Sequence, residues 1–324
     1  MCAIPPAALG PPGRPPRFGR RHKGGQPLSR RIWRDRWMYA FILPGVLYYI
    51  VFIYIPLVGN LIAFKDYSPF LGFEKSPWVG LDNFRAIFDD PDFKLALTNT
   101  LQIEALQLFF AFPAPLGLAL LLNSMVSEKT KRAVQSIVYL PHFLSWVIVI
   151  SLWQQVFGGV GFINGLLREN GMDTINIMSN PDFFKPLVVL QTIWKECGWG
   201  TILFLAALTK IDVQLYEAAV MDGANGWRRL RDVTLPGIRS VIVLLLILRL
   251  AFALSVGFEQ YYLQRNAVGP GAAEVLDTFI YFRGIQSGDW GFAAAVGLVR
   301  GVVAAILIVT ANWLAKRFGE EGIF

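Results

Sequence analysis

Six long apolar stretches constrain this chain more than any other feature of its sequence. A hydrocarbon core about 30 Å thick needs about 20 apolar residues in a helix, and each stretch is long enough. The chain is 54% apolar and 16% charged, whereas soluble domains carry about a quarter charged residues. We therefore predict an all-α membrane protein with six transmembrane helices. The spans are Met38 to Phe64, Leu97 to Leu122, Ile137 to Phe157, Leu187 to Leu208, Ile238 to Tyr262 and Gly291 to Leu314.

Basic residues gather on one side of these spans, and by the positive-inside rule that side is the cytoplasm. They are the basic tail, Lys129, Lys131 and Arg132 after the second span, Arg228, Arg229 and Arg231 after the fourth, and Lys316 and Arg317 after the sixth. Both termini are therefore expected in the cytoplasm. The expected organisation is a tail (1–37), a six-span domain (38–314) with a cytoplasmic loop at 209–236, and a short C-terminus (315–324).

The basicity of the chain belongs to its tail. Residues 1–37 hold nine Lys/Arg and one Asp, a sum of +8, so the remainder carries −1 of the net +7. This Pro- and Arg-rich composition cannot bury a core and predicts a disordered cytoplasmic extension. We expect it to set the orientation of the chain in the membrane. Nucleic-acid or phosphate binding is the alternative.

Catalytic and metal-binding arrangements are not indicated. The chain has two histidines, His22 and His142, and two cysteines, Cys2 and Cys197, none with metal-ligand spacing. No Gly-Lys pair occurs, so the chain cannot contain a G-x-x-x-x-G-K-[ST] phosphate loop. We therefore predict no metal, no cofactor and no enzyme activity of its own, and any ATP hydrolysis would come from a separate subunit.

The polar segment between the fourth and fifth spans predicts a helix, a turn and a second helix. Asp212 can cap the first helix, Gly223 interrupts it, and Asn225 can cap the second. Val213, Tyr216 and Val220 recur at helical spacing, and we expect them to face the bundle.

Small and acidic residues in this segment suit close docking of another surface. The candidate docking residues are Glu217, Ala218, Ala219, Asp222, Gly223 and Ala224. The alternative is an amphipathic interfacial helix whose arginines touch anionic lipid. From the residues alone, the two interpretations are equally supported.

The same residues resemble a known motif. Glu217-Ala-Ala, Asp222-Gly-Ala and Leu235-Pro236 resemble the EAA loop of permease subunits in binding-protein-dependent ABC importers of type I. The resemblance implies that the six docking residues form a coupling helix seated in an ATPase subunit. It also implies a bacterial inner-membrane location and three kinds of partner: a sister permease, two ATP-binding-cassette subunits and an extracytoplasmic solute-binding protein.

Other stretches resemble the carbohydrate-importer branch of that family. They are "WVGLDNFRAIFDDPDF" from Trp78, "YLPHFLSW" from Tyr139, "GFINGLL" from Gly161 and "TFIYFRGIQSGDWGFAAAVGL" from Thr278. The last is similar to oligosaccharide and polysaccharide permeases, and the whole pattern also resembles alginate importers. The resemblance covers nearly everything after the tail and implies a carbohydrate substrate.

Charged residues within the spans predict the substrate path. A charge at the bilayer centre costs about 2.5 to 3.5 kcal/mol on insertion scales, so such residues should face the bundle interior. In the related maltose-type permease, sugar contacts come from the spans on either side of the coupling loop. The candidates are Gln191, Trp194, Lys195, Glu196, Arg249, Phe252, Glu259 and Arg300. On the fourth span Gln191, Trp194 and Lys195 share a helix face, and on the fifth Arg249, Phe252 and Glu259 do likewise.

Two alternatives remain open at this stage. One interpretation pairs Glu196 with Lys195 or Arg249 only to neutralise charge in the core, whereas three cations at mid-depth slightly favour an anionic saccharide. At the level of function, the alternative is a self-contained secondary transporter or channel without an ATPase partner, for which no internal repeat is evident.

Overall fold

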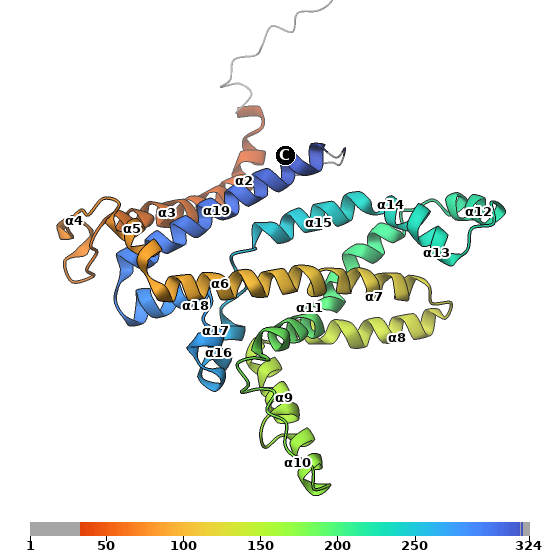
Figure 1. The fold of residues 1–324 in the computed structure, drawn as a ribbon. Coiled ribbons are helices and arrows are strands. Elements are labelled where there is room, and N and C mark those ends of the chain that lie inside the picture. The colour runs from red at the N-terminus through yellow and green to blue at the C-terminus, as the bar shows by residue number, and fades with distance from the viewer. Residues whose placement is uncertain (1–32, 318, 320–324) are drawn as a thin grey trace, which may run out of the picture. The chain divides into compact units, whose positions relative to one another are not determined.

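The computed structural model describes residues 33–317 and 319, and within them every regular element is a helix (Figure 1). One isolated antiparallel bridge joins Lys65 and Trp78. The chain separates into two compact units, with the boundary between Val58 and Gly59, and each unit is described by itself. Most of the predicted tail, residues 1–32, and residues 318 and 320–324 of the predicted C-terminus lie outside the described residues.

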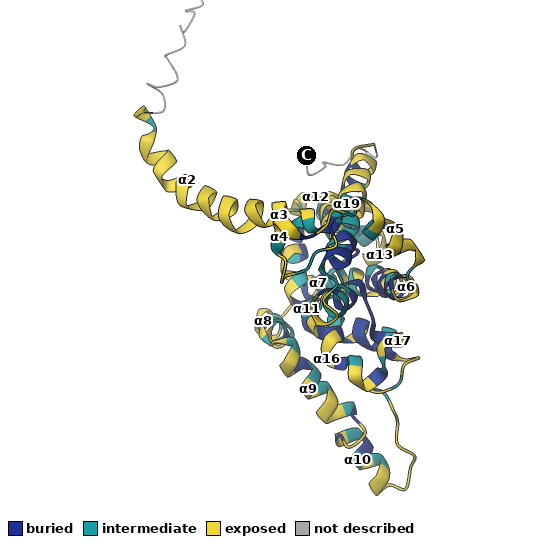
Figure 2. Cartoon of the chain, turned by 90° about the vertical axis from the view of Figure 1, so that its left-hand side faces the viewer, coloured by how far each residue is buried: buried dark blue, intermediate teal, exposed yellow. Residues whose placement is uncertain are grey.

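The described part of the first unit is one unbroken run of helix. It comprises α2 (Arg36–Tyr49), the π-helical segment η1 (Ile50–Tyr54) and the start of α3 (Ile55–Gly59). Pro44 lies inside α2, and no residue of α2 or η1 is buried (Figure 2). A helix with apolar side chains exposed on all sides is typical of a segment that contacts lipid or another subunit.

Among the residues that the structure describes, four helical stretches are long and apolar enough to cross a membrane: Arg36–Phe64, Pro91–Asn123, Trp146–Glu169 and Trp290–Arg317. A fifth is possible if Gly226–Gly237 and Arg239–Ala251, which are bent by 61° relative to each other, form one span. The helix α11 (Phe184–Leu208) has 25 residues, or about 37 Å at 1.5 Å per residue. It is less apolar than the others because its centre carries Gln191, Lys195 and Glu196. The count of six therefore stays a prediction.

The second predicted span is helical from end to end but contains a π-helical segment. It consists of α6 (Pro91–Leu106), the π-helical segment η3 (Gln107–Ala111) and α7 (Pro113–Asn123). The carboxylate of Asp90 accepts from the backbone N–H of Phe93 at 2.9 Å and Pro91 occupies the first turn, so the start of α6 is well capped. The π-helical segment turns Gln107 into the protein, where it is buried.

The helix α11 packs against α7, η3, α6 and α8 (Glu128–Tyr139). One hydrophobic cluster joins it to α7 and to the residue before α15 (Arg239–Ala251) through Ala119, Phe204, Ala207, Leu208 and Ile238. At Gly198 the backbone of α8 comes so close that an added Cβ would lie 1.9 Å from the carbonyl oxygen of Val138. Only glycine permits this approach.

The third predicted span is not one helix. Helix α8 gives way to a short 3₁₀ segment, η4 (Leu140–Phe143), and a new helix, α9 (Trp146–Phe157), begins after it. Pro141 cannot donate the hydrogen bond that a continuing helix needs, and Ser145 caps α9 through Ile148 N at 3.4 Å. After a short turn the chain continues as α10 (Phe162–Glu169).

The fifth predicted span is broken as well. Helix α15 ends at Ala251 and α16 (Glu259–Val268) starts after a non-helical stretch that includes Gly257 with φ +106°. Our expectation that Arg249, Phe252 and Glu259 share one helix face was therefore wrong. Phe252 is the C-cap residue that follows α15, and the helical spacing between Phe252 and Glu259 is lost in the non-helical stretch.

The last part of the second unit packs around α19 (Trp290–Arg317). The segment η2 (Asn60–Phe64), α5 (Asp82–Asp89), α18 (Leu276–Tyr281) and the π-helical segment η6 (Phe282–Gln286) all contact this helix. Two short helices complete the unit, α4 (Gly72–Lys75) and α17 (Pro270–Ala273). A hydrophobic cluster holds these elements together, and its buried residues include Ile87, Leu276 and Phe292.

Candidate functional site

The predicted helix–turn–helix after the fourth span is confirmed. The carboxylate of Asp212 accepts from Gln214 N at 2.9 Å, and α12 (Val213–Met221) follows. Gly223 has φ +73° and ends the helix, and the side chain of Asn225 accepts from Arg228 N at 2.9 Å to start α13 (Gly226–Arg229). The chain then passes through the π-helical segment η5 (Leu230–Thr234) into α14 (Leu235–Gly237). We call residues 212–229 the hairpin.

The hairpin projects from the end of the second unit where α7 ends and α8 begins (Figure 1). Glu217, Ala218, Asp222 and Gly223 are exposed, whereas Ala219 and Ala224 are half-buried. Met221, between them, is 87% exposed. Four exposed small or acidic residues and two half-buried alanines thus form an open surface around the side chain of Met221.

One expectation about the hairpin was wrong. Val213 and Val220 are exposed and do not pack against the bundle. Only Tyr216 of that face is partly covered, and its hydroxyl lies 3.0 Å from the hydroxyl of Thr234. This face therefore contacts the segment η5 through Tyr216, while its two valines stay exposed.

Arg228 at the end of the hairpin and Arg231 in η5 are exposed, whereas Arg229 is half-buried. Arg231 Nε donates to Asp232 at 2.7 Å, and this hydrogen bond lowers the pKa of the Asp232 carboxyl. Arg229 lines a cavity of about 760 Å³ together with Asn123, Ser124 and Tyr216. The cavity separates the hairpin from the end of α7.

A second cavity, of about 480 Å³, lies among η3, α7, α11 and α15, a volume typical of small-ligand sites. It brings together three of the predicted path residues, Glu196, Arg249 and Phe252. Trp199 and Phe112 also line it, so aromatic rings flank a carboxylate and a guanidinium. Phe252 and Trp199 are 65% and 48% exposed, so the cavity opens to the surface of the chain. We call it the central cavity.

Arg249 is held from behind by polar groups on α6 and η3. Its Nη2 lies 2.9 Å from Glu104 Oε2 and also donates to Gln107 Oε1. Gln107 Nε2 in turn donates to the Tyr261 hydroxyl at 3.4 Å. The Glu104 side chain is 7% exposed and the Arg249 side chain 33%, so the guanidinium faces the cavity and the carboxylate does not.

Glu196 is held by a cluster that the sequence did not suggest. Its Oε2 lies 2.7 Å from His142 Nδ1 and its Oε1 lies 3.3 Å from Lys195 Nζ. The ring of His142 stacks on Trp199, with centroids 4.5 Å apart and planes within 5°. The pairing of Glu196 with Lys195 is thus present, and the pairing of Glu196 with Arg249 is not among the ion pairs of the described residues.

The remaining residues predicted on α11 and α16 do not line the central cavity. Gln191 is fully buried and exchanges amide hydrogen bonds of 3.0 Å with Gln264. Trp194 lies edge-on to Trp153, with centroids 6.4 Å apart. Glu259 is exposed at the first turn of α16.

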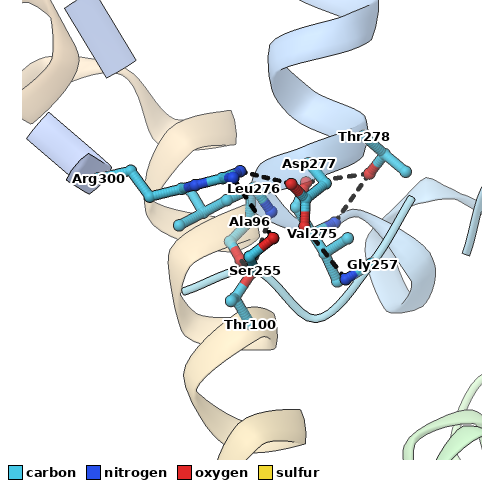
Figure 3. Close-up of polar contacts among 9 residues, drawn as sticks. All are labelled: Ala96, Thr100, Ser255, Gly257, Val275, Leu276, Asp277, Thr278 and Arg300. Atoms are coloured by element: carbon cyan, nitrogen blue, oxygen red, sulfur yellow. Dashed lines mark hydrogen bonds and ion pairs between the residues drawn. The ribbon is translucent and has the colours of Figure 1, made fainter. Parts of the chain in front are cut away.

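Arg300 contacts the non-helical stretch that breaks the fifth predicted span. It forms an ion pair with Asp277 and donates to Ser255 Oγ at 3.3 Å (Figure 3). The same carboxylate accepts from Gly257 N at 3.3 Å. Arg300 therefore ties α19 and α18 to the non-helical stretch between α15 and α16. It does not line the central cavity.

Sequence reasoning missed Trp199 and His142. Trp199 lies one helical turn after Lys195, so its face could have been deduced. His142 is 54 residues from Glu196, and no local pattern joins them. Within the described part of the chain, no group of three His, Cys, Asp or Glu residues could hold a metal ion.

Known proteins resemble this chain over most of its length. Residues 112–320 match the model of the family described as "Binding-protein-dependent transport system inner membrane component". Protein LplB of Bacillus subtilis (strain 168) is 51% identical over 292 residues, 90% of this chain and 92% of that protein. The polygalacturonan/rhamnogalacturonan transport system permease protein YteP of the same organism is 47% identical over 92% of this chain and 93% of its own length.

A solved structure shares the fold. The bacterial alginate ABC transporter, crystallised in complex with an alginate pentasaccharide-bound periplasmic protein, contains a chain with a TM-score of 0.83 and 36% identity. The match covers 92% of this chain and 100% of the other. The fold is therefore that of a type I ABC permease. The chain belongs to the family of inner-membrane components of binding-protein-dependent transport systems.

Proposed function

We propose that this chain is the permease subunit of an ATP-driven importer of oligosaccharides or polysaccharides. The observation that carries the proposal is the central cavity, where Trp199 and Phe252 flank Glu196 and Arg249. Aromatic faces stack on sugar rings, while charged and polar groups bond the hydroxyls. The names of the relatives point the same way, since they concern polygalacturonan, rhamnogalacturonan and alginate.

The charges of the cavity suit a saccharide with acidic units. Lys195, Arg249 and Arg300 each have an acidic partner, so the count of cations alone no longer favours an anion. The exposure of Arg249 still favours an anion, because its guanidinium faces the cavity while its partner Glu104 is buried behind it. A carboxylate of the sugar would meet the guanidinium first, and Glu196 would accept from hydroxyls.

The other predicted path residues act around the cavity in this proposal. Gln191 and Arg300 hold α16 and the broken fifth span in place through their hydrogen bonds. Lys195 holds Glu196. Trp194 and Glu259 would meet the substrate only outside the central cavity, along the exposed surface of α11 and α16.

The hairpin is the proposed coupling element. Its exposed acidic and small residues, with Met221 at the centre, would seat in a cleft of an ATP-binding-cassette subunit. The complex would contain this chain, a sister permease, two such subunits and an extracytoplasmic solute-binding protein. Lacking a Gly-Lys pair, this chain would contribute no ATPase site, and closure of the ATPase subunits would drive alternating access.

The proposed topology has six spans, with both termini and loop 209–236 in the cytoplasm. It can be tested with single cysteines introduced in a Cys2→Ser, Cys197→Ser background. Phe70 and Ser179 are exposed in the two loops expected outside, and Ser127 is exposed in a loop expected inside. An impermeant maleimide should label the first two in intact cells and spare the third. Labelling of Ser127→Cys alone would reverse the map.

Substitution of two tryptophans of α11 tests whether the saccharide passes through the central cavity. Trp199 and Trp194 are similarly exposed, but only Trp199 lines the central cavity. The assay is stimulation of ATPase activity of the reconstituted complex, with its binding protein, by oligogalacturonides, alginate pentasaccharide, arabino-oligosaccharides or maltose. Trp199→Ala should lower the stimulation about tenfold, in line with loss of an aromatic contact. Trp194→Ala should retain it, and equal losses would place the path elsewhere.

The same preparation tests the alternative function. A secondary transporter or channel would purify without a stoichiometric ATPase subunit and would move saccharide down its gradient without ATP. Co-purification with an ATPase and strict dependence on ATP are the results expected from the proposal.

A further inference from the structure

His142 is a titratable side chain at the break between α8 and α9. It belongs to η4, where the predicted third span is interrupted, and it is half-buried. Three α11 residues contact it: Lys195 Nζ donates to its carbonyl oxygen at 2.7 Å, Glu196 lies 2.7 Å from its Nδ1, and Trp199 stacks on its ring. Two of these three residues line the central cavity.

The backbone forces this arrangement. Because Gly198 of α11 has no side chain, the end of α8 packs directly against its backbone, and any side chain at this position would prevent that contact. Pro141 ends α8 directly afterwards, and the freed carbonyl of His142 is satisfied by Lys195, which is itself 6% exposed. The ring of His142 is thereby fixed between Glu196 and Trp199.

The hydrogen-bonding capacity of the groups sets the direction of the bond. An ionised carboxylate only accepts, so Nδ1 of His142 carries the proton and donates a hydrogen bond to Glu196 Oε2. The parallel ring covers one part of the Trp199 indole, while Trp199 as a whole remains 48% exposed and lines the cavity. One imidazole therefore orients both a carboxylate and an aromatic ring of the cavity wall.

We propose that His142 is a positioning residue that holds Trp199 and Glu196 in the orientation in which they receive a saccharide. This inference rests on the proposed function of the central cavity. His142 acts through those two side chains and is not among the residues that line the cavity. The ionisable groups that contact it are Lys195 and Glu196 of α11, and Arg249 faces the same cavity from α15.

Two substitutions separate the two contacts. His142→Asn places an amide N–H close to the position of Nδ1 but removes the ring, whereas His142→Phe keeps a flat ring without a donor. Leu140→Ala is the matched control, because Leu140 belongs to the same segment and is exposed. The assay is oligogalacturonide-stimulated ATPase activity of the reconstituted complex with its binding protein.

We expect His142→Phe to raise the half-stimulating saccharide concentration about tenfold, roughly the factor for one lost hydrogen bond to a charged group. His142→Asn should raise it as well, because the ring that orients Trp199 is lost. The maximal stimulated rate should stay within about twofold of wild type, because only orientation changes. In a Glu196→Gln background, His142→Phe should cost less, since the two residues act as a unit. Leu140→Ala should match wild type. A lower maximal rate at unchanged half-stimulating concentration would overturn the proposal.

A spectroscopic measurement tests the geometry without any saccharide. The ring of His142 covers one face of the Trp199 indole, so the emission of Trp199, taken as the difference between wild type and Trp199→Phe, should shift when His142→Asn uncovers that face. His142→Phe keeps a flat ring there and should leave the emission closer to that of wild type. If the emission of Trp199 is the same in wild type and His142→Asn, the stack does not exist and the proposal fails. If the emission shifts as expected but no saccharide stimulates the wild type, the proposed function fails and the structural pairing stands.

Discussion

The hairpin and the central cavity differ in how their residues find each other. In the hairpin every cap and turn joins neighbours in sequence, such as Asp212 with Gln214 and Asn225 with Arg228. In the cavity the decisive contacts join distant residues, such as Arg249 with Glu104, which are 145 positions apart. Local signals therefore predict the hairpin, whereas the cavity depends on packing that no local pattern contains.

The largest effect is expected from a substitution at the close approach of α8 and α11, which should disrupt the cavity and leave the hairpin intact. Gly198→Ala would place a methyl group 1.9 Å from the carbonyl oxygen of Val138. Forced separation of packed helices costs about 1 to 3 kcal/mol or more, and here backbone must move. We expect a large loss of folded complex, measured as monodisperse yield and thermal midpoint in detergent.

Gly165→Ala is the control, because it adds the same methyl group to a helix where nothing lies within 4 Å. Its thermal midpoint should equal or slightly exceed that of wild type. If Gly198→Ala is equally harmless, the α8–α11 contact does not hold the cavity together.

The ion pair of Arg249 tests whether this cation stabilises the bundle or serves the substrate. Arg249→Ala leaves the carboxylate of Glu104 buried without its partner. Breaking a fully buried pair costs about 3 to 5 kcal/mol, and we expect less here because the guanidinium is partly exposed. Yield should therefore fall. The double variant Glu104→Gln, Arg249→Met removes both charges and should regain stability.

The saccharide response separates the two roles of Arg249. If Arg249 binds an acidic saccharide, the double variant should stay unresponsive to oligogalacturonides although it is stable. High salt should also weaken the response of the wild type, since screening grows with ionic strength. Recovery of the full response together with stability would make Arg249 a packing residue.

A smaller effect on stability is expected at the turn of the hairpin. Gly223 has φ +73° and open space around it, so Gly223→Val strains the backbone without a clash. The αL penalty is about 1 to 2 kcal/mol for a non-glycine residue. The chain should still insert and assemble, but ATP hydrolysis should lose its dependence on saccharide.

Gly226→Val is the matched control, because Gly226 has the same open surroundings without a positive φ. It should leave coupling intact. Full coupling in Gly223→Val would remove the main support for the hairpin as the coupling element.

The smallest effect concerns the exposed pair of Arg231 and Asp232. Its hydrogen bond lowers the pKa of Asp232, so any stabilisation is present above the unfolded pKa of about 3.9 and is lost as the pH falls through the folded value. Exposed pairs contribute little. Asp232→Asn should leave the thermal midpoint unchanged between pH 6 and 8, approximately the range in which this carboxyl stays ionised. A clear shift would show that the pair is buried in the assembled complex.

The limits of sequence reasoning follow from the same comparison. Helical class, the hairpin and its caps were predicted, because Asp, Asn, Gly and Pro act on their own neighbours. The breaks at Pro141 and Gly257 were not, since both lie within apolar runs that satisfy a length criterion for a span. Glu196, Arg249 and Phe252 were brought together as expected. Trp199, His142 and the role of Glu104 needed the packing of α11 on α6, η4 and η3.

The native cysteine of α11 gives the most direct test that saccharide occupies the central cavity. Cys197 lines the cavity with Glu196 and Trp199 and can be modified by a small methanethiosulfonate in a Cys2→Ser background, with Cys197→Ser as the blank. We predict that oligogalacturonide, added with the binding protein and ATP, slows modification of Cys197, and that modification stops saccharide uptake into proteoliposomes. An unchanged rate of modification under conditions of active uptake, or full uptake after complete modification, would contradict the account.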